Sequence, residues 1–212
     1  MAFDLLRAIF NFGIAEHMVT MNPCIGVKTG TSGIRETILE DATDYARLFE
    51  TLDKMERELR IAQPAADAIR LVALTGCRRG EAAKLRWRHV ERGRIVLPPA
   101  SHKTGKRTGK RKIITLPAEA QAIIARQPER GPDDYVFFPA KGEGGISLSV
   151  PWRKVRKEAS LPANIGLHGL RHSVGSHMAM SGSQAPEIMT ALGQRQLSTV
   201  QRFRRDCPPS CG

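Results

Sequence analysis

The stretch Leu167-His168-Gly169-Leu170-Arg171-His172, near the C-terminal end, decides how the rest of the chain is interpreted. In a helix, His168, Arg171 and His172 stand at positions i, i+3 and i+4, so their side chains are expected to share one face. A solvated polar face is one explanation of this triplet. An anion-binding site is the other, since arginine offers a planar fork of donors and imidazole exchanges protons near neutral pH.

The composition favours a polyanionic partner. The 212 residues carry 33 Lys and Arg against 21 Asp and Glu, which gives a net charge of +12 and a pI near 10.1. Nucleic acid is the simplest partner for such a chain, and a membrane surface is the other candidate. No apolar run is long enough to span a bilayer, no signal-peptide pattern is evident, and the four cysteines lack zinc-like spacing. We therefore expect a cytoplasmic protein.

Hydrophobic periodicity predicts a mostly helical chain. Apolar residues recur at helical spacing in residues 3–19, 40–58 and 63–74. A loop rich in Gly, Thr and Ser follows the first of these segments and runs to about Ile34. The 3–19 helix is either the tail of something further N-terminal or an ordinary first helix of the domain.

A basic turn follows the third predicted helix. Thr75-Gly76-Cys77-Arg78-Arg79-Gly80-Glu81 interrupts the periodicity, and a new helix is predicted from about Gly80. Such a turn can aim Arg78 at a ligand while the helices around it fix its position. Arg78 and Arg79 could equally be surface charges, and Glu81 could be a helix N-terminal charge favoured by the macrodipole.

Two β-branched runs, 95–97 and 113–116, predict a β-hairpin. The segment between them, residues 101–112, contains six Lys and Arg and no acidic residue. We expect a long, mobile tip that follows a phosphate backbone, with a loop kept soluble by its charge as the alternative. A later basic helix could clamp the same backbone or form a solvated face. The predicted DNA-binding residues are Lys106, Arg107, Lys110, Arg111, Lys112, Arg153 and Arg156.

The remaining segments continue the helical pattern, with helices at 118–127, 168–181 and 185–192 and a short extended segment at 134–139. The predicted fold is therefore mainly α with a small antiparallel β-sheet, in the α+β class.

Taken in order, these segments resemble the tyrosine recombinases, the phage-integrase family. The resemblance rests on Thr75-Gly76-x-Arg78-x-x-Glu81, a lysine-bearing hairpin, His168-x-x-Arg171-His172, and Leu192-Gly193 followed by Ser198-Thr199-x-Gln201-Arg202. It extends over residues 35 to 203. It implies an integrase-like catalytic domain at 35–212, a linker at 22–34, and the last helix of a truncated core-binding domain at 1–21.

The resemblance implies that a tyrosine cuts one DNA strand, forming a 3′-phosphotyrosyl link and freeing a 5′-hydroxyl without a metal or cofactor. Arg78 and Arg171 would hold the non-bridging oxygens of the scissile phosphate, where charge accumulates in the transition state. Lys103 would protonate the leaving 5′-oxygen, with Lys106 a weaker substitute. The remaining implied roles are proton transfer for His168 and support of the site for Glu81 and His172.

Two residues depart from the family pattern. Gln194 follows the Leu-Gly pair, where the family has His or Trp, and Phe203 stands where the nucleophilic tyrosine is expected. A phenyl ring has no oxygen to attack phosphorus. The chain has two tyrosines, Tyr45 and Tyr135, and neither is a plausible replacement. We therefore predict a chain that binds duplex DNA and positions a phosphate without forming a covalent link.

Three alternatives stay open at this point. The first is a non-enzymatic DNA-binding remnant or regulator derived from an integrase. The second is a type IB topoisomerase, which shares the chemistry, and the third is a basic RNA-binding protein, in which Arg78 and Arg171 have no special role. The expected partners are double-stranded DNA and further copies of the chain, because active relatives work as tetramers on DNA. A bacterial or phage origin is expected, with no role for a membrane.

Overall fold

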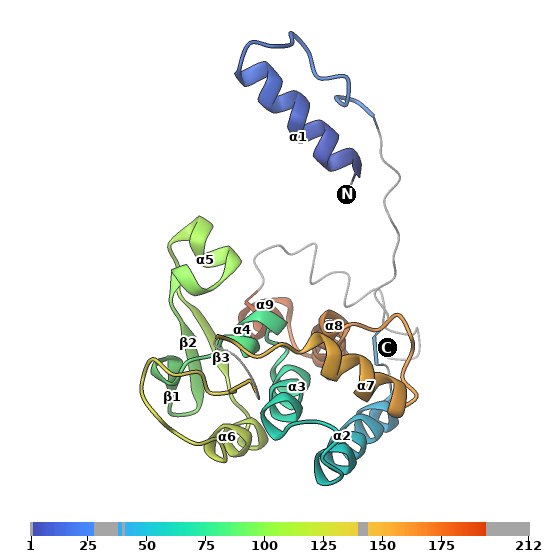
Figure 1. Cartoon of the computed structure of the whole chain (residues 1–212), viewed down its shortest axis with the longest axis vertical. Coiled ribbons are helices and arrows are strands. Elements are labelled where there is room, and N and C mark those ends of the chain that lie inside the picture. The colour runs from blue at the N-terminus through green and yellow to red at the C-terminus, as the bar shows by residue number, and fades with distance from the viewer. Residues whose placement is uncertain (1, 28–37, 40, 140–143, 194–212) are drawn as a thin grey trace. The chain divides into compact units, whose positions relative to one another are not determined.

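The computed structural model describes residues 2–27, 38–39, 41–139 and 144–193 (Figure 1). The chain divides into two units, Met1–Arg35 and Glu36–Gly212. Each unit is described by itself, and the predicted residues Gln194 and Phe203 lie outside the described ranges.

The first unit contains one helix, α1 (Ala2–Ala15), within the part of it that the structure describes. The helix ends earlier than the predicted 3–19 because the backbone turns at His17, which has a φ of 57°. Just beyond this turn, the Met18 amide donates to the Gly13 carbonyl over 2.8 Å. Leu5, Ile9 and Phe12 are exposed on this unit.

The larger unit is built around α3 (Gln63–Thr75), which runs through its middle (Figure 1). This helix packs against α2 (Ala42–Arg57), α6 (Ala118–Ala125), α7 (Ser149–Glu158) and α8 (Leu167–Met180). A helix buried on so many sides needs small and apolar residues all round rather than on one stripe. Its alanines and aliphatic residues meet that need: Ala65, Ala66, Ala68, Ile69, Leu71, Val72 and Ala73 are all buried.

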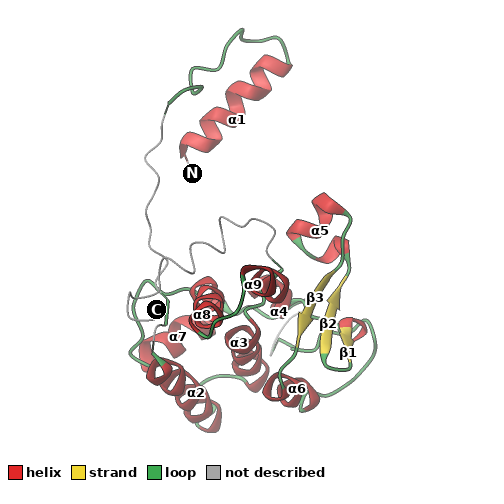
Figure 2. Ribbon diagram, turned by 180° about the vertical axis from the view of Figure 1, so that it is seen from behind, coloured by secondary structure: helices red, strands yellow, loops and turns green. Residues whose placement is uncertain are grey.

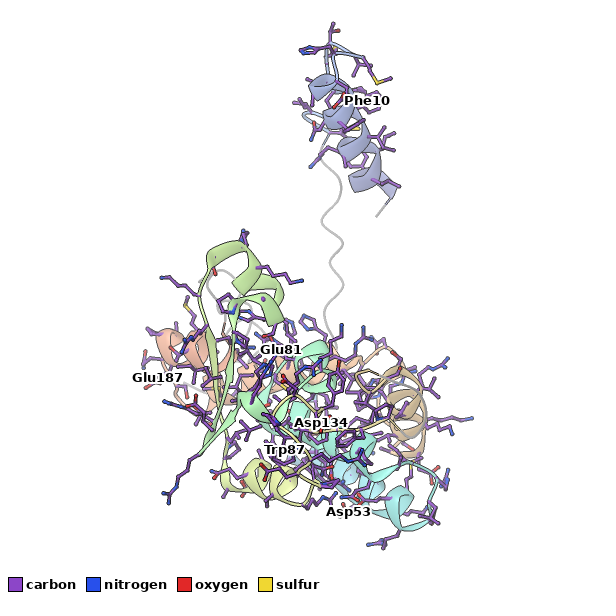
Figure 3. All side chains as sticks on the ribbon, turned by 60° about the vertical axis from the view of Figure 1, so that its left-hand side comes forward. Phe10, Asp53, Glu81, Trp87, Asp134 and Glu187 are labelled. Atoms are coloured by element: carbon purple, nitrogen blue, oxygen red, sulfur yellow. The ribbon has the colours of Figure 1, made fainter. Side chains whose placement is uncertain are left out.

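Two charged residues on α3 form hydrogen bonds with side chains of the neighbouring helices. Asp67 is fully buried and accepts hydrogen bonds from Arg70, Arg126 and Gln127. Arg70 also bonds Asp53, which lies at the outer edge of this unit in Figure 3. Because a buried charge is tolerated only when it is paired, this network fixes the places of α2 and α6 relative to α3.

The predicted hairpin is present within a three-stranded antiparallel sheet of β1 (Val90–Glu91), β2 (Arg94–Leu97) and β3 (Lys112–Thr115) (Figure 2). Strand β3 pairs with β2 so that Ile114 faces Ile95 and Lys112 faces Leu97. These four side chains are buried. The alternation of side chains along a strand therefore turns Lys112 toward the core.

The tip of the hairpin contains a helix, where the sequence predicted a loop. A 3-10 turn, η2 (Pro99–Ser101), is followed by α5 (Lys103–Thr108). His102 caps α5, since its Nδ1 accepts the Gly105 amide over 3.0 Å, and Gly109 ends the helix in the left-handed region. In Figures 1 and 2 this helix stands at the end of the strands that lies away from α6.

The remaining described elements are α4 (Arg79–Ala83), the 3-10 turn η1 (Trp87–His89) and α9 (Ala185–Leu192). Val136 and Phe137 are buried in the predicted extended segment, where Tyr135 forms an isolated bridge with Arg86. The predicted fold class, mainly α with a small antiparallel sheet, is confirmed. In the described part of the chain, no helix is both long enough and apolar enough to cross a membrane.

Candidate active site

Arg78 is held in place by Glu81 at the start of α4. Gly76 ends α3 with a φ of 62°, and its amide donates to the Val72 carbonyl, which turns the chain toward α4. Glu81 Oε2 accepts the Arg78 backbone amide over 2.8 Å, and Oε1 accepts Arg78 Nη1 over 3.0 Å. One carboxylate therefore fixes both the backbone and the guanidinium of Arg78, whose side chain is 30% exposed.

The same carboxylate binds a buried lysine. Lys112 Nζ lies 2.6 Å from Glu81 Oε2, and both side chains are almost completely buried. Burial opposes ionisation of Glu81, but the Lys112 ammonium and the Arg78 amide outweigh it and hold the pKa of this carboxyl below its ordinary value. The prediction that Lys112 follows DNA with the other hairpin cations is corrected, because its ammonium is turned inward onto Glu81. Figure 3 shows Glu81 inside the larger unit.

Arg171 is the largest fully buried side chain of the described residues. Its Nη1 donates to the Gly76 carbonyl over 2.6 Å, its Nη2 donates to the Leu192 carbonyl, and its Nε has no hydrogen-bond partner among the described residues. Burial, together with the nearby charge of Arg78, lowers the pKa of Arg171 to about 10. This arginine therefore joins the end of α3 to the end of α9.

The two histidines of the triplet lie apart from Arg171 at the surface of α8. His168 and His172 contact each other edge to face, with ring centroids 4.7 Å apart and Nε2 atoms 3.2 Å apart. The expectation of one shared face is therefore wrong for the arginine. Residues 171 and 172 are separated by about 100° around a helix, which is enough to place one in the core and the next outside.

The other predicted residues occupy different surroundings. Lys106, Arg107, Lys110 and Arg111 are exposed on α5 and the connection that follows it. Lys103 begins α5, but its side chain lies outside the described set. On α7, Arg153 is exposed, whereas Arg156 is partly buried and donates to the Ile165 carbonyl over 3.3 Å.

Sequence reasoning missed a basic cavity of about 560 Å³ between α4 and the η2–α5 segment. Lys84, Arg86, His102 and Lys106 line it beside Tyr135. The Arg86 guanidinium stacks over the Tyr135 ring at 4.5 Å and donates to its hydroxyl over 3.2 Å. Lys84 and Arg86 come from one segment of the chain and Lys106 from another, so only the fold reveals that these cations share one cavity. Across the described residues, no group of three His, Cys, Asp or Glu is placed to hold a metal ion.

Fold and site together define a class of protein: a mostly helical, basic α+β domain that brings two arginines from separate segments to one place beside a cation-bearing hairpin. The family model described as "Phage integrase family" matches residues 41–208. The chain belongs to the phage integrase family, and the resemblance drawn from its motifs is confirmed.

Curated relatives agree with this assignment. The chain is 24% identical over 210 residues to the tyrosine recombinase XerC of Haemophilus ducreyi, covering 94% of this chain and 65% of the relative. It is 24% identical over 212 residues to the tyrosine recombinase XerD of Listeria innocua, covering 93% and 68%. The chain thus spans about two thirds of the length of these relatives.

Solved structures show the same fold. A lambda integrase dimer bound to a COC′ core site superposes with a TM-score of 0.72 at 18% identity, over 98% of this chain and 73% of that one. The XerA recombinase superposes with a TM-score of 0.63, also at 18% identity, over 97% of this chain and 70% of that one.

Proposed function

We propose that this chain is the catalytic domain of a site-specific DNA recombinase of the tyrosine class, in which the site binds a DNA phosphate but forms no covalent link. The observation that carries the proposal is the junction at Gly76, where Arg171 binds the carbonyl that ends α3 and Glu81 holds Arg78 two residues further on. The match to the phage integrase family and the DNA complex of the lambda integrase support it.

The proposed chemistry divides among the residues as follows. Arg78 and Arg171 bind the non-bridging oxygens of the DNA phosphate. The Arg78 side chain is partly exposed, whereas Arg171 is buried and donates to two carbonyls, so its guanidinium reaches a phosphate only after the junction between α3 and α9 rearranges. With a tyrosine at position 203, Lys103 would donate a proton to the leaving 5′-oxygen and His168 would assist proton transfer from that tyrosine. In the chain as it stands, the site binds the phosphate and the strand is not cut. Glu81 positions Arg78, and His172 supports His168 from the next turn. No metal or other cofactor takes part in this scheme.

The missing step is nucleophilic attack, because Phe203 has no hydroxyl. Tyr45 cannot replace the nucleophile, because its hydroxyl is buried and its ring lies edge to face against His177 on α8. The same burial raises the pKa of Tyr45 to about 12. Tyr135 is occupied by Arg86, which covers its ring and bonds its hydroxyl. Double-stranded DNA remains the proposed partner, with an assembly of several copies on paired sites.

The proposed domain boundaries are those predicted from the sequence. We propose a catalytic domain at 35–212, a linker at 22–34, and the last helix of a core-binding domain at 1–21. The apolar residues exposed on α1 are suited to such packing.

The test uses a supercoiled plasmid that carries the DNA flanking the gene. The chain itself, Phe203→Tyr, and Phe203→Tyr with Arg78→Ala are each incubated with it, and nicked DNA bound to protein is measured. We expect an adduct from Phe203→Tyr alone. An adduct from the unmodified chain would refute the proposal, because Phe203 could then not be the disabling residue.

A second candidate is a non-enzymatic DNA-binding regulator derived from an integrase. Phe203 favours it directly, since a regulator needs no nucleophile. A footprint at a defined site, unchanged by Phe203→Tyr and without any adduct, would support this candidate over the first.

A further inference from the structure

Lys112 makes its closest polar contact with the carboxylate that holds Arg78. Its Nζ lies 2.6 Å from Glu81 Oε2, the oxygen that also accepts the Arg78 amide. The Lys112 and Glu81 side chains are 5% and 4% exposed, so DNA cannot reach this ammonium without a rearrangement. Lys112 is thereby distinguished from the exposed cations Lys106 and Lys110 of the same hairpin.

The stem of Lys112 packs against a second part of the site. Gly193 ends α9 in the left-handed region with a φ of 58°. A Cβ atom there would lie 2.6 Å from Lys112 Cε and 3.1 Å from Lys112 Cγ, so the stem fills the space that a side chain would need. The preceding residue, Leu192, is the one whose carbonyl accepts the Arg171 guanidinium.

The charge of Lys112 determines how available the Arg78 guanidinium is to a ligand. Arg78, Glu81, Lys112 and Arg171 carry three positive charges and one negative charge, a sum of +2. With Lys112 present, a buried ammonium neutralises the Glu81 carboxylate. Without it, Arg78 would be the main counter-charge of a buried carboxylate and would be less available to a phosphate.

We infer that Lys112 is a positioning residue of the phosphate site. Its ammonium holds Glu81, and through it Arg78, while its stem packs against Gly193 at the end of α9. This inference rests on the proposed function for the identity of the ligand, a DNA phosphate. The contact between Lys112 and Glu81 does not depend on that proposal. It replaces the prediction that Lys112 binds DNA directly.

The experiment compares Lys112→Met with the matched control Lys110→Met, which removes an exposed cation from the same hairpin. Both substitutions are also made in the Glu81→Gln background, because Lys112→Met alone leaves a buried carboxylate with a single partner and can unfold the chain. The readouts are the Arg78 backbone amide signal in ¹⁵N-labelled protein and the affinity for a short DNA duplex at fixed salt.

If Lys112 acts through Glu81, Lys112→Met shifts the Arg78 amide and weakens binding about tenfold, the size expected for one charged contact. In the Glu81→Gln background the same substitution then changes the affinity by less than about twofold. Lys110→Met leaves the Arg78 amide in place and weakens binding equally in both backgrounds.

Two results would overturn the inference. One is an Arg78 amide that Lys112→Met leaves unmoved in the folded protein. The other is an equal loss of affinity from Lys112→Met with and without Glu81→Gln, which is the behaviour of a direct DNA contact. If the unmodified chain binds no DNA, the proposed function fails, and the amide signal still decides whether Lys112 positions Arg78.

Discussion

At the scale of single residues, two carbonyl oxygens hold the Arg171 guanidinium between the ends of α3 and α9. An ammonium at this position keeps the charge but cannot reach both carbonyls with the fork of an arginine. Arg171→Lys should therefore leave at least one buried carbonyl unsatisfied and lower the free energy of unfolding by about 1–3 kcal/mol. Urea denaturation measures the change.

The control for this substitution is Arg79→Lys. Arg79 is exposed and bonds only the Ser149 hydroxyl among the hydrogen bonds described. Its replacement should alter the free energy of unfolding by no more than about 0.5 kcal/mol. Equal effects of the two substitutions would mean that the Arg171 carbonyl contacts contribute nothing.

Glu81 should give the fold a specific acid sensitivity. Its pKa in the folded chain lies below the ordinary 4.5, so between these two values the unfolded chain binds more protons than the folded one. The stabilisation is therefore complete above about pH 4.5 and is lost as the pH falls through the folded pKa. The difference in free energy of unfolding between the unmodified chain and Glu81→Gln with Lys112→Met should be flat from pH 7 to 5 and shrink below. A difference that grows on acidification would contradict this.

At the scale of elements, Gly76 ends α3 in the left-handed region, directly against α9. A Cβ atom at Gly76 would lie 2.6 Å from Leu192 Cδ2, inside the core. Gly109, which ends α5, has nearly the same φ, but nothing lies within 4 Å of its Cβ position. We expect Gly109→Ala to lower the free energy of unfolding by about 1 kcal/mol, because it adds backbone strain only. Gly76→Ala should lower it by more than about 2 kcal/mol, because the new methyl group also clashes with Leu192. Thermal or urea unfolding of the two variants would separate the cost of backbone strain from that of the clash. Equal losses of unfolding free energy in both variants would exclude the clash.

The elements themselves could be predicted from the sequence because their signals are local. Helical periodicity located the segments that became α2, α3, α8 and α9 to within a few residues. The helix α5 could not be predicted in this way, since Lys103–Thr108 contains a glycine and has no apolar stripe. It is stabilised instead by caps at its two ends, from His102 and Gly109.

At the scale of the whole molecule, the sequence predicted which residues form the candidate site but not how deeply they are buried. The resemblance drawn from the order of the motifs predicted that Arg78, Glu81 and Arg171 share one site, and in the structure they meet around Gly76. Burial depends on the partners that other elements bring, so the inward turn of Lys112 and the carbonyl contacts of Arg171 could not be predicted. The net charge predicted a polyanionic partner, but only the fold separates the cations that face outward from those that are paired inside.

That separation leads to a prediction about DNA affinity. The four exposed cations of the hairpin, Lys106, Arg107, Lys110 and Arg111, lie at one end of the larger unit, away from α2 (Figures 1 and 2). If each neutralises a phosphate, replacing all four with Gln should reduce the slope of log affinity against log salt by about 3 to 4, since each contact adds about 0.9. Fluorescence anisotropy with a labelled duplex over a salt series gives this slope.

The matched control removes the same charge from the other end of the unit. Arg47, Lys54, Arg57 and Arg60 are exposed on α2 and just beyond it. Their replacement with Gln lowers the net charge equally but removes no proposed phosphate contact, so the slope should change by less than about 1. Because the net charge falls by four in both variants, a general attraction between a basic protein and DNA predicts equal effects. Equal slopes would therefore refute a hairpin-centred interface, whereas a loss confined to the hairpin variant would place the DNA beside the carboxylate-held Arg78.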